Sequence, residues 1–234
     1  MCRFEIPPHC PSLKNSEQNT AAGLRMRLKE TRASLPISER ERGALLMRAR
    51  LFTWLNAARD ALAPSGRKLA CVAAFWPLGD EPDLRPLLEQ WADSDVQVCL
   101  PCVKGPGQPL VFRAWTPDAP MAAGAYGIAE PTQGPDCQPD VILVPTLGYT
   151  DRADRLGYGG GYYDRTLAAL EQAGHDCIAI GIAWHECRLP EDYEPASHDR
   201  RLDAVLTPEG WVPRAPLQAG PPAGKSRIMR FIFG

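Results

Sequence analysis

DVILVPTLGYTDRADRLGYGGGYYDR, residues 140–165, is the stretch of the sequence that is most informative about the fold. It begins with a nearly continuous apolar run, which is typical of a strand buried on both faces of a sheet. A loop rich in charge and glycine follows, and from Tyr162 the apolar spacing becomes that of a helix. A buried strand that leads through a glycine-rich loop into a helix predicts one βαβ unit of an α/β protein.

Three further apolar runs with β-branched residues repeat the strand pattern, each bounded by Pro, Gly or charge. These runs are LACVAAFW (69–76), VQVCLP (96–101) and CIAIGIAW (177–184), and PLVFRAW (109–115) predicts a further strand pair. Helical segments over residues 84–91 and 162–173 lie between some of these strands. We therefore expect βαβ crossovers and a three-layer α/β fold, with a mostly parallel sheet flanked by helices.

Two helices are predicted before the first strand. The first, over residues 23–35, has apolar positions at helical spacing and a cationic stripe along one face. The apolar positions are Leu24, Leu28 and Leu35, and the cationic stripe consists of Arg25, Lys29 and Arg32. The second helix opens with a capping box, Ser38 followed by Glu41. Its residues expected to pack on the core are Leu45, Ala49, Phe52 and Leu55.

Composition and charge exclude several classes of protein. With 234 residues and 44% apolar content, the chain is long enough to bury a core. A net charge of -2 argues against sequence-independent nucleic-acid binding. The N-terminal stretch lacks the apolar core of a secretory signal, and no apolar run reaches the ~18 residues of a membrane span. We therefore expect a cytoplasmic protein whose eight cysteines are thiols rather than disulfides.

The two ends of the chain differ in composition from the middle. Residues 1–20 are polar and contain proline, and residues 212–234 are rich in Pro and Gly. We expect the first to be a flexible N-terminal extension and the second a C-terminal tail. A single α/β domain is expected over residues 21–211.

The glycine cluster predicts an anion site. Gly157 and the glycines at 159–161 can adopt left-handed conformations, so their backbone N–H groups can form an anion-binding nest. The helix that begins near Tyr162 adds its positive N-terminus, and Asp164 brings a hard oxygen ligand for Mg²⁺. The alternative is a glycine-rich turn that only joins a strand to a helix. The spacing matches neither a P-loop nor GxGxxG, which disfavours a dinucleotide-dependent oxidoreductase.

Several segments together resemble one known family. RLGYGGGYYDR (155–165), the N-terminal LR helix, FWPLGDEPDL (75–84), YGIAEP (126–131) and HDRRLDAVLTPEG (198–210) have the order and spacing of the 5-formyltetrahydrofolate cyclo-ligases, also called methenyltetrahydrofolate synthetases. The resemblance covers residues 23–210. It implies a Rossmann-like fold of the NagB/RpiA/CoA-transferase type.

The activity that this resemblance implies is an ATP- and Mg²⁺-dependent ring closure. 5-Formyltetrahydrofolate becomes 5,10-methenyltetrahydrofolate, with release of ADP and phosphate, because the formyl oxygen takes the γ-phosphoryl group and N10 then attacks the activated carbon. The implied partner is the small-molecule folate, with or without a polyglutamate tail, and neither nucleic acid nor a membrane; we expect a monomer. A non-catalytic folate- or RNA-binding relative on the same fold is the alternative.

The resemblance also implies roles for individual residues. The implied ATP-contacting residues are Arg25, Arg155, Leu156, Gly157, Tyr158, Gly159, Gly160, Gly161, Tyr162 and Tyr163. The implied Mg²⁺ ligands are Asp164 and Asp199, and the implied catalytic residues are Arg155, Tyr162 and Asp164. The implied folate-binding residues are Trp76, Glu81, Tyr126 and Tyr162. A carboxylate suits the paired N–H donors of a pterin, and aromatic walls suit a flat heterocycle. For Trp76 and Tyr126, ordinary core packing is the alternative.

At two places the sequence departs from the family pattern. Ala21 stands where the family commonly has a lysine that reaches the ATP phosphates, so weaker nucleotide binding is expected. The candidates to replace that lysine are Lys14, Lys29 and Arg32. The stretch WHECRLP (184–190) lacks the glutamine that is often found near Cys187.

The remaining Cys and His residues are interpreted as structural. Cys99 and Cys102 have the spacing of a redox pair, but the residues after them do not open a helix, so we interpret them as structural thiols. A zinc site would need two further ligands. The other cysteines considered, which show no second short-spaced pair, are Cys137, Cys177 and Cys187. His185 and His198 are interpreted as helper or surface histidines.

Overall fold

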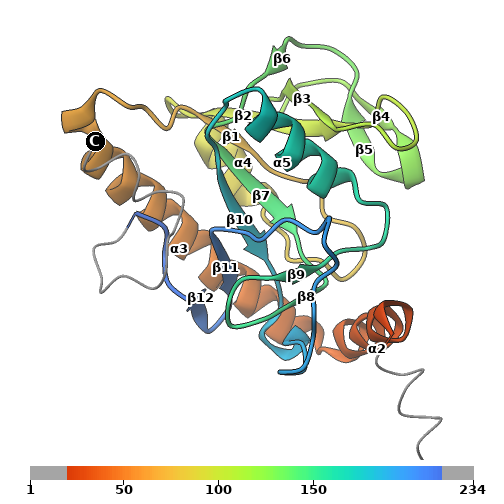
Figure 1. Ribbon diagram of the computed structural model, residues 1–234. Coiled ribbons are helices and arrows are strands. Elements are labelled where there is room, and N and C mark those ends of the chain that lie inside the picture. Colours follow the sequence, from red (N-terminus) through yellow and green to blue (C-terminus); the bar gives the residue numbers. More distant parts are fainter. Residues whose placement is uncertain (1–19, 218–234) are drawn as a thin grey trace, which may run out of the picture.

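An eight-stranded sheet separates two helical layers in the computed structural model, which describes residues 20–217 (Figure 1). The strands of this sheet are β1 (Cys71–Ala73), β2 (Gln97–Cys102), β3 (Val111–Ala114), β6 (Asp136–Cys137), β7 (Val141–Pro145), β10 (Ile178–Ile182), β11 (Ala204–Thr207) and β12 (Gly210–Val212). Their order across the sheet is β12-β11-β10-β7-β1-β2-β3-β6. The five central strands pair in parallel, and the three outer strands pair antiparallel with their neighbours. The predicted three-layer α/β fold is therefore confirmed.

The helices lie where the sequence predicts them. The described helices are α2 (Ala21–Ser34), α3 (Ile37–Leu62), α4 (Arg85–Ala92) and α5 (Tyr162–Gln172), with short 3₁₀ turns at 63–65, 125–127 and 185–187. Two small antiparallel ladders complete the fold. They pair β4 (Met121–Ala123) with β5 (Ala129–Pro131), and β8 (Gly148–Tyr149) with β9 (Arg155–Leu156).

Strand β7 illustrates why the sheet needs cover on both faces. Val141 and Leu143 belong to the hydrophobic cluster that contains the buried side chains of α3 and α4. Ile142 and Val144 belong to a second cluster, which contains Leu167 of α5. Because successive side chains of a strand point to opposite faces, a continuous apolar run requires a helical layer on each side.

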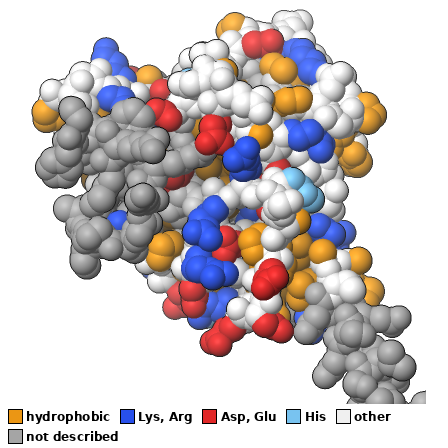
Figure 2. Space-filling model, viewed as in Figure 1, with side chains coloured by type: hydrophobic (Ala, Val, Ile, Leu, Met, Phe, Trp, Pro, Cys, Tyr) orange, Lys and Arg blue, Asp and Glu red, His pale blue; other side chains and the backbone are white. Residues whose placement is uncertain are grey.

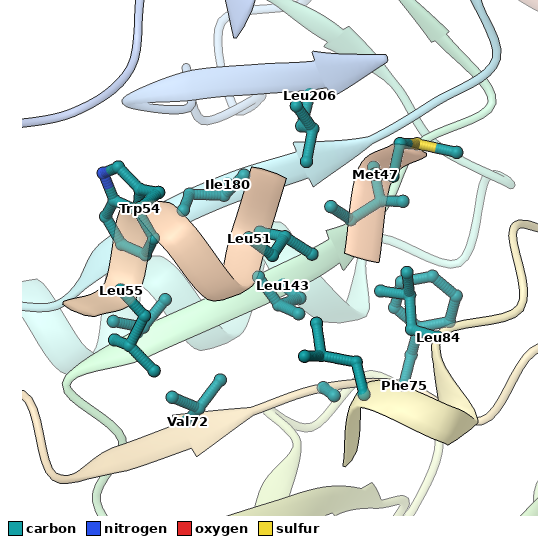
Figure 3. Close-up of a cluster of buried hydrophobic side chains, with 14 of the residues drawn as sticks. Met47, Leu51, Trp54, Leu55, Val72, Phe75, Leu84, Leu143, Ile180 and Leu206 are labelled. Atoms are coloured by element: carbon teal, nitrogen blue, oxygen red, sulfur yellow. The ribbon is translucent and has the colours of Figure 1, made fainter. Parts of the chain in front are cut away.

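Helix α3 provides much of the helical layer that covers the face of the sheet with Val141 and Leu143. Figure 3 shows Met47, Leu51 and Leu55 of this helix beside Leu143 and Ile180 of the sheet. All five side chains are fully buried. Burial of a side chain of this size contributes roughly 1.5–3 kcal/mol relative to leaving it exposed.

The predicted core face of α3 was largely wrong. Of the four residues expected to be buried, only Leu55 is; Leu45, Ala49 and Phe52 are exposed. The helix carries two apolar stripes, and the one that contains Ala44 and Leu51 is the one that faces the sheet. A shift of one residue turns a helix face by about 100°, so periodicity alone does not decide between neighbouring stripes.

The predicted capping box is also wrong. Helix α3 begins at Ile37, its N-cap is Pro36, and no side chain caps it. Proline fixes φ near -65° and has no backbone N–H group. Helix α3 therefore begins directly after Pro36, without a polar side chain that caps its first turn. Ser38 therefore lies within the first turn of the helix.

The predicted extension and tail fall mostly outside residues 20–217, so their boundaries remain predictions. Strand β12 crosses the expected start of the tail, and Trp54 Nε1 of α3 donates a hydrogen bond of 2.9 Å to the carbonyl oxygen of Pro216. Among the helices that the structure describes, none combines the length and apolar character needed to span a bilayer.

The packing of α3 predicts a large effect for one of its leucines and a small effect for another. Leu51→Ala removes a fully buried side chain and should lower the free energy of unfolding by about 2–5 kcal/mol. Leu45→Ala, on the exposed stripe, should change it by less than about 0.5 kcal/mol. Urea denaturation measures both, and equal losses would contradict the packing described here.

Candidate functional site

A cavity of about 430 Å³ opens at the carboxyl ends of the parallel strands. Phe75 and Trp76 follow β1, Val103 follows β2, and Pro145 ends β7, and all of them line it. This is the edge at which open α/β sheets bind their ligands. The sequence-predicted site residues that line the same cavity are Arg25, Trp76, Glu81, Tyr126, Arg155, Leu156, Gly157, Tyr158, Gly159, Gly160, Gly161, Tyr162, Tyr163, Asp164 and Asp199. The structure therefore brings every predicted site residue to one place.

The loop between β9 and α5, residues 157–161, requires glycine for two reasons. Gly159 and Gly161 have φ of +98° and +64°, which disfavours residues with a side chain. A Cβ at Gly157 would lie 2.7 Å from Arg155 Nη1, so the guanidinium group fills the space that a side chain would need. Arg25 Nε of α2 donates a hydrogen bond of 2.8 Å to the Gly157 carbonyl oxygen. The loop is therefore held by cations on its inner side.

A buried ion pair fixes the two ends of this loop. Arg155 Nη2 lies 2.6 Å from Asp164 Oδ2, and both residues are buried. The other oxygen of Asp164 accepts a hydrogen bond of 3.1 Å from the backbone N–H of Arg200. Asp164 therefore joins β9, α5 and the segment that precedes β11.

Asp199 lines the same cavity and directly precedes Arg200 in the chain. One oxygen of its carboxylate accepts the N–H of Ala196 at 2.9 Å, and the other lies 3.7 Å from His198 Nε2. His198 is largely exposed at the cavity wall. Asp164 and Asp199 thus supply carboxylate oxygens from two separate segments.

Glu81 is held by a chain of hydrogen bonds that starts on α2. Arg32 donates to the hydroxyl of Tyr158, which in turn donates to Glu81 Oε1 at 2.5 Å. Glu81 Oε2 accepts the backbone N–H of Leu78 at 2.9 Å. Burial raises the pKa of Glu81, and the hydrogen bond from Tyr158 acts in the opposite direction. Burial also raises the pKa of Tyr158, which keeps its hydroxyl protonated and able to donate.

The cationic stripe of α2 is therefore only partly a solvated face. Arg25 contacts the glycine loop, and Arg32 is buried against Tyr158. Lys29 Nζ lies 5.9 Å from the centre of the Tyr158 ring. Of the candidates to replace the missing lysine at Ala21, Lys29 and Arg32 support this tyrosine, and Lys14 lies outside the described residues.

Aromatic rings form the opposite part of the cavity. The Tyr126 and Tyr162 rings lie edge to face at 6.1 Å, with their hydroxyl oxygens 3.2 Å apart. Tyr126 is 72% exposed, so core packing does not explain it. Trp76 both lines the cavity and packs on the core, where its ring meets Trp115 at 6.0 Å.

Sequence reasoning missed Glu130. This residue lines the cavity and accepts the backbone N–H of Val103 at 3.3 Å. Its signal was present, because Glu130 belongs to the YGIAEP segment that also contains Tyr126. The other missed wall residues, including Leu110 and Ile128, are apolar and carry no chemical group that would mark them as site residues.

A second cavity of about 490 Å³ adjoins the first and shares Arg25, His198 and Asp199 with it. Ala21, the first residue of α2, is part of its wall. A longer cationic side chain at this position would therefore begin beside Arg25.

The molecular surface carries mixed charge on the face drawn in Figure 2, where Lys and Arg side chains alternate with Asp and Glu. A nucleic-acid site would instead be expected to gather basic side chains in one patch. This face therefore offers no support for the RNA-binding alternative.

Known proteins resemble this chain over most of its length. A model of the 5-formyltetrahydrofolate cyclo-ligase family matches residues 17–208. A 5-formyltetrahydrofolate cyclo-ligase of Mycolicibacterium smegmatis is 32% identical over 197 residues, which are 80% of this chain and 92% of the relative. The cyclo-ligase of Escherichia coli K12 is 32% identical over 144 residues, 58% of this chain and 77% of the relative.

Two solved structures share the fold. The 5,10-methenyltetrahydrofolate synthetase of Aquifex aeolicus superimposes with a TM-score of 0.65 at 25% identity, covering 87% of this chain and 96% of that one. A 5,10-methenyltetrahydrofolate synthetase from Mycoplasma pneumoniae gives a TM-score of 0.60 at 20% identity, covering 80% of this chain and 98% of its own. The second match bears on the fold alone.

The buried ion pair predicts a large cost for losing one partner. Asp164→Asn leaves Arg155 without its counter-ion and should lower the free energy of unfolding by about 3–5 kcal/mol. Asp151→Asn, which breaks an exposed pair with Arg188, should cost at most about 1 kcal/mol. Urea denaturation at neutral pH compares the two, and a similar small loss for both would show that the buried pair does not hold the loop.

The raised pKa of Glu81 predicts a stability difference that depends on pH. The folded protein binds the Glu81 proton more tightly than the unfolded chain does, so above the raised pKa the half-buried carboxylate destabilises the fold. Glu81→Gln should therefore be more stable than wild type at neutral pH, and the difference should vanish as pH falls to the ordinary value of 4.5. Thermal denaturation from pH 4 to 8 measures this. A gap that does not change with pH would contradict it, and Glu89→Gln on the exposed side of α4 is the control.

Proposed function

This chain belongs to the 5-formyltetrahydrofolate cyclo-ligase family, and from that premise we propose that it uses ATP and Mg²⁺ to cyclise 5-formyltetrahydrofolate to 5,10-methenyltetrahydrofolate, with release of ADP and phosphate. The observation that supports this most directly is the position of Tyr158. It belongs to the glycine loop and also holds Glu81. An anion site and a carboxylate suited to a pterin are therefore walls of one cavity.

The reaction needs positioning more than it needs a protein nucleophile. The formyl oxygen attacks the γ-phosphorus of ATP, and ADP leaves. N10 then attacks the activated formyl carbon and gives up its proton, and the C–O bond breaks to release phosphate. Catalysis of phosphoryl transfer rests on alignment and charge stabilisation, which glycine amides and guanidinium groups supply.

The glycine loop fits a phosphate chain. The glycines have no side chains of their own, guanidinium groups lie close beside them, and α5 begins at the end of the loop with its N-terminus. Arg155 Nε is buried without a hydrogen-bond partner among residues 20–217, so an anion in the cavity would supply the acceptor it lacks. We assign Arg25, Arg155 and residues 156–163 to ATP binding, and Arg155 to stabilisation of the transferring group.

The two aspartates fit a hard cation to different degrees. Asp164 already accepts hydrogen bonds from Arg155 and Arg200, whereas Asp199 has one oxygen whose nearest partner is His198 at 3.7 Å. We therefore propose Asp199 as the more direct Mg²⁺ ligand, with Asp164 completing the set. When bound, Mg²⁺ would neutralise phosphate charge.

The folate is proposed to lie between Glu81 and the aromatic side chains. The carboxylate of Glu81 is desolvated, which strengthens hydrogen bonds to the N–H groups of a pterin. Trp76, Tyr126 and Tyr162 offer flat faces for the ring, and Tyr162 adjoins the glycine loop. This order places the formyl group next to the phosphate site.

A direct assay tests the proposal. The full-length protein is mixed with Mg²⁺, ATP and 5-formyltetrahydrofolate, and the near-ultraviolet absorbance of the conjugated methenyl product is followed. We expect a rise that requires ATP and is lost in Glu81→Gln at low substrate. If the absorbance shows no ATP-dependent rise while the protein still binds folate, the proposed activity is wrong and the protein is a non-catalytic folate-binding relative.

Ala21 gives a second prediction in the same assay. Ala21→Lys places a cation at the wall that is shared with Arg25, so the KM for ATP should fall, by about 10-fold for one charge-assisted hydrogen bond. Ala21→Gln, of similar length without charge, is the control. Equal KM values for wild type and Ala21→Lys would show that the lysine of the family has been replaced by another cation.

A further inference from the structure

Three thiols lie together in the hydrophobic cluster that contains Leu167 of α5, and none of them lines the cavity. Cys71 of β1, Cys99 of β2 and Cys137 of β6 have sulfur atoms that all lie within 4.8 Å of one another. The Cys71 and Cys99 sulfurs are 3.8 Å apart. The sequence shows no second short-spaced pair of cysteines, and the structure instead brings Cys99 together with two cysteines that are distant in the chain.

Strand register explains how residues so far apart in the sequence come together. Cys99 is paired with Ala114 of β3, and Phe112, two residues away on the same face of that strand, is paired with Cys137. Ala114 is small, so the Cys137 side chain can extend over β3 towards Cys99. On the other side, Cys71 of the parallel strand β1 is two residues before Ala73, the partner of Cys99.

The spacing of the three sulfur atoms is compatible with coordination of one metal ion. Three sulfurs spaced by 3.8 Å would place a central ion about 2.2 Å from each, close to the ~2.3 Å of a metal–thiolate bond. The longer separations, up to 4.8 Å, need only small rotations of side chains. No fourth His, Cys, Asp or Glu joins the group within residues 20–217.

We propose that Cys71, Cys99 and Cys137 form a three-thiolate site for a soft metal ion, with Cu(I) as the preferred occupant. Zinc in structural sites takes four ligands, whereas Cu(I) is satisfied by three sulfurs and is selected by thiolates. Cys71 and Cys99 are buried, and Cys137 is half-buried on the edge strand, so the ion would enter past Cys137. Binding converts thiols to thiolates and releases their protons to solvent.

The site would cross-link the sheet rather than take part in the reaction. Cys71 and Cys99 lie on strands whose carboxyl ends carry Trp76 and Val103 of the cavity. An ion bound only by the folded protein would stabilise these strands and raise the melting temperature. The inference does not depend on the proposed activity.

Competition for Cu(I) tests the proposal. The reduced full-length protein is titrated anaerobically with Cu(I) in the presence of a chromogenic Cu(I) chelator, and native mass spectrometry counts the bound ions. We expect one Cu(I) ion bound to each protein molecule, and X-ray absorption should find three sulfur atoms bound to the copper. Cys137→Ser should weaken binding by at least about 100-fold, since loss of even an indirect partner costs ~10–100-fold.

Matched variants separate this site from other thiols. Cys177→Ser changes a half-buried cysteine outside the cluster and should bind as wild type does. A Cys2→Ser/Cys10→Ser background removes thiols outside residues 20–217 and should also retain the ion. Cu(I) should raise the melting temperature of these proteins but not of Cys137→Ser. Wild-type affinity in Cys137→Ser, or fewer than three sulfur neighbours, would overturn the proposal.

Discussion

The buried ion pair between Arg155 and Asp164 is the contact on which the rest of the site depends. It closes the loop of glycines between β9 and α5, and through Arg200 it also holds the segment that contains Asp199. A desolvated carboxylate is favourable only while its partners remain in place. The loop, the first turn of α5 and the strand segment that leads to β11 are therefore positioned together.

The sequence was sufficient where local pattern and burial coincide. The runs around β1, β2, β7 and β10 are apolar on both faces because helices cover both faces, so their composition alone predicts buried parallel strands. The site residues could be predicted from the sequence for another reason. They lie in short segments with an unusual composition, and the parallel topology brings the carboxyl ends of those strands together.

The sequence was insufficient where tertiary packing selects between equivalent patterns. Helix α3 has two apolar stripes, and only the sheet decides that Leu51 rather than Leu45 is buried. The burial of Arg32 depends on how α2 meets the glycine loop. The thiol cluster depends on the register of β6 against β3, which no spacing between cysteines in the chain encodes.

Tyr158 has a consequence for how the affinities of two ligands in this cavity would depend on each other. Its backbone belongs to the loop that would receive phosphates, and its hydroxyl donates to Glu81, which is proposed to bind the pterin. Any movement of the loop caused by one ligand changes how firmly Glu81 is held for the other. Because such coupling is thermodynamically reciprocal, the nucleotide and the folate would raise or lower each other's affinity by the same factor. In the proposed complex, the two halves of the cavity would therefore be coupled through the hydroxyl of Tyr158.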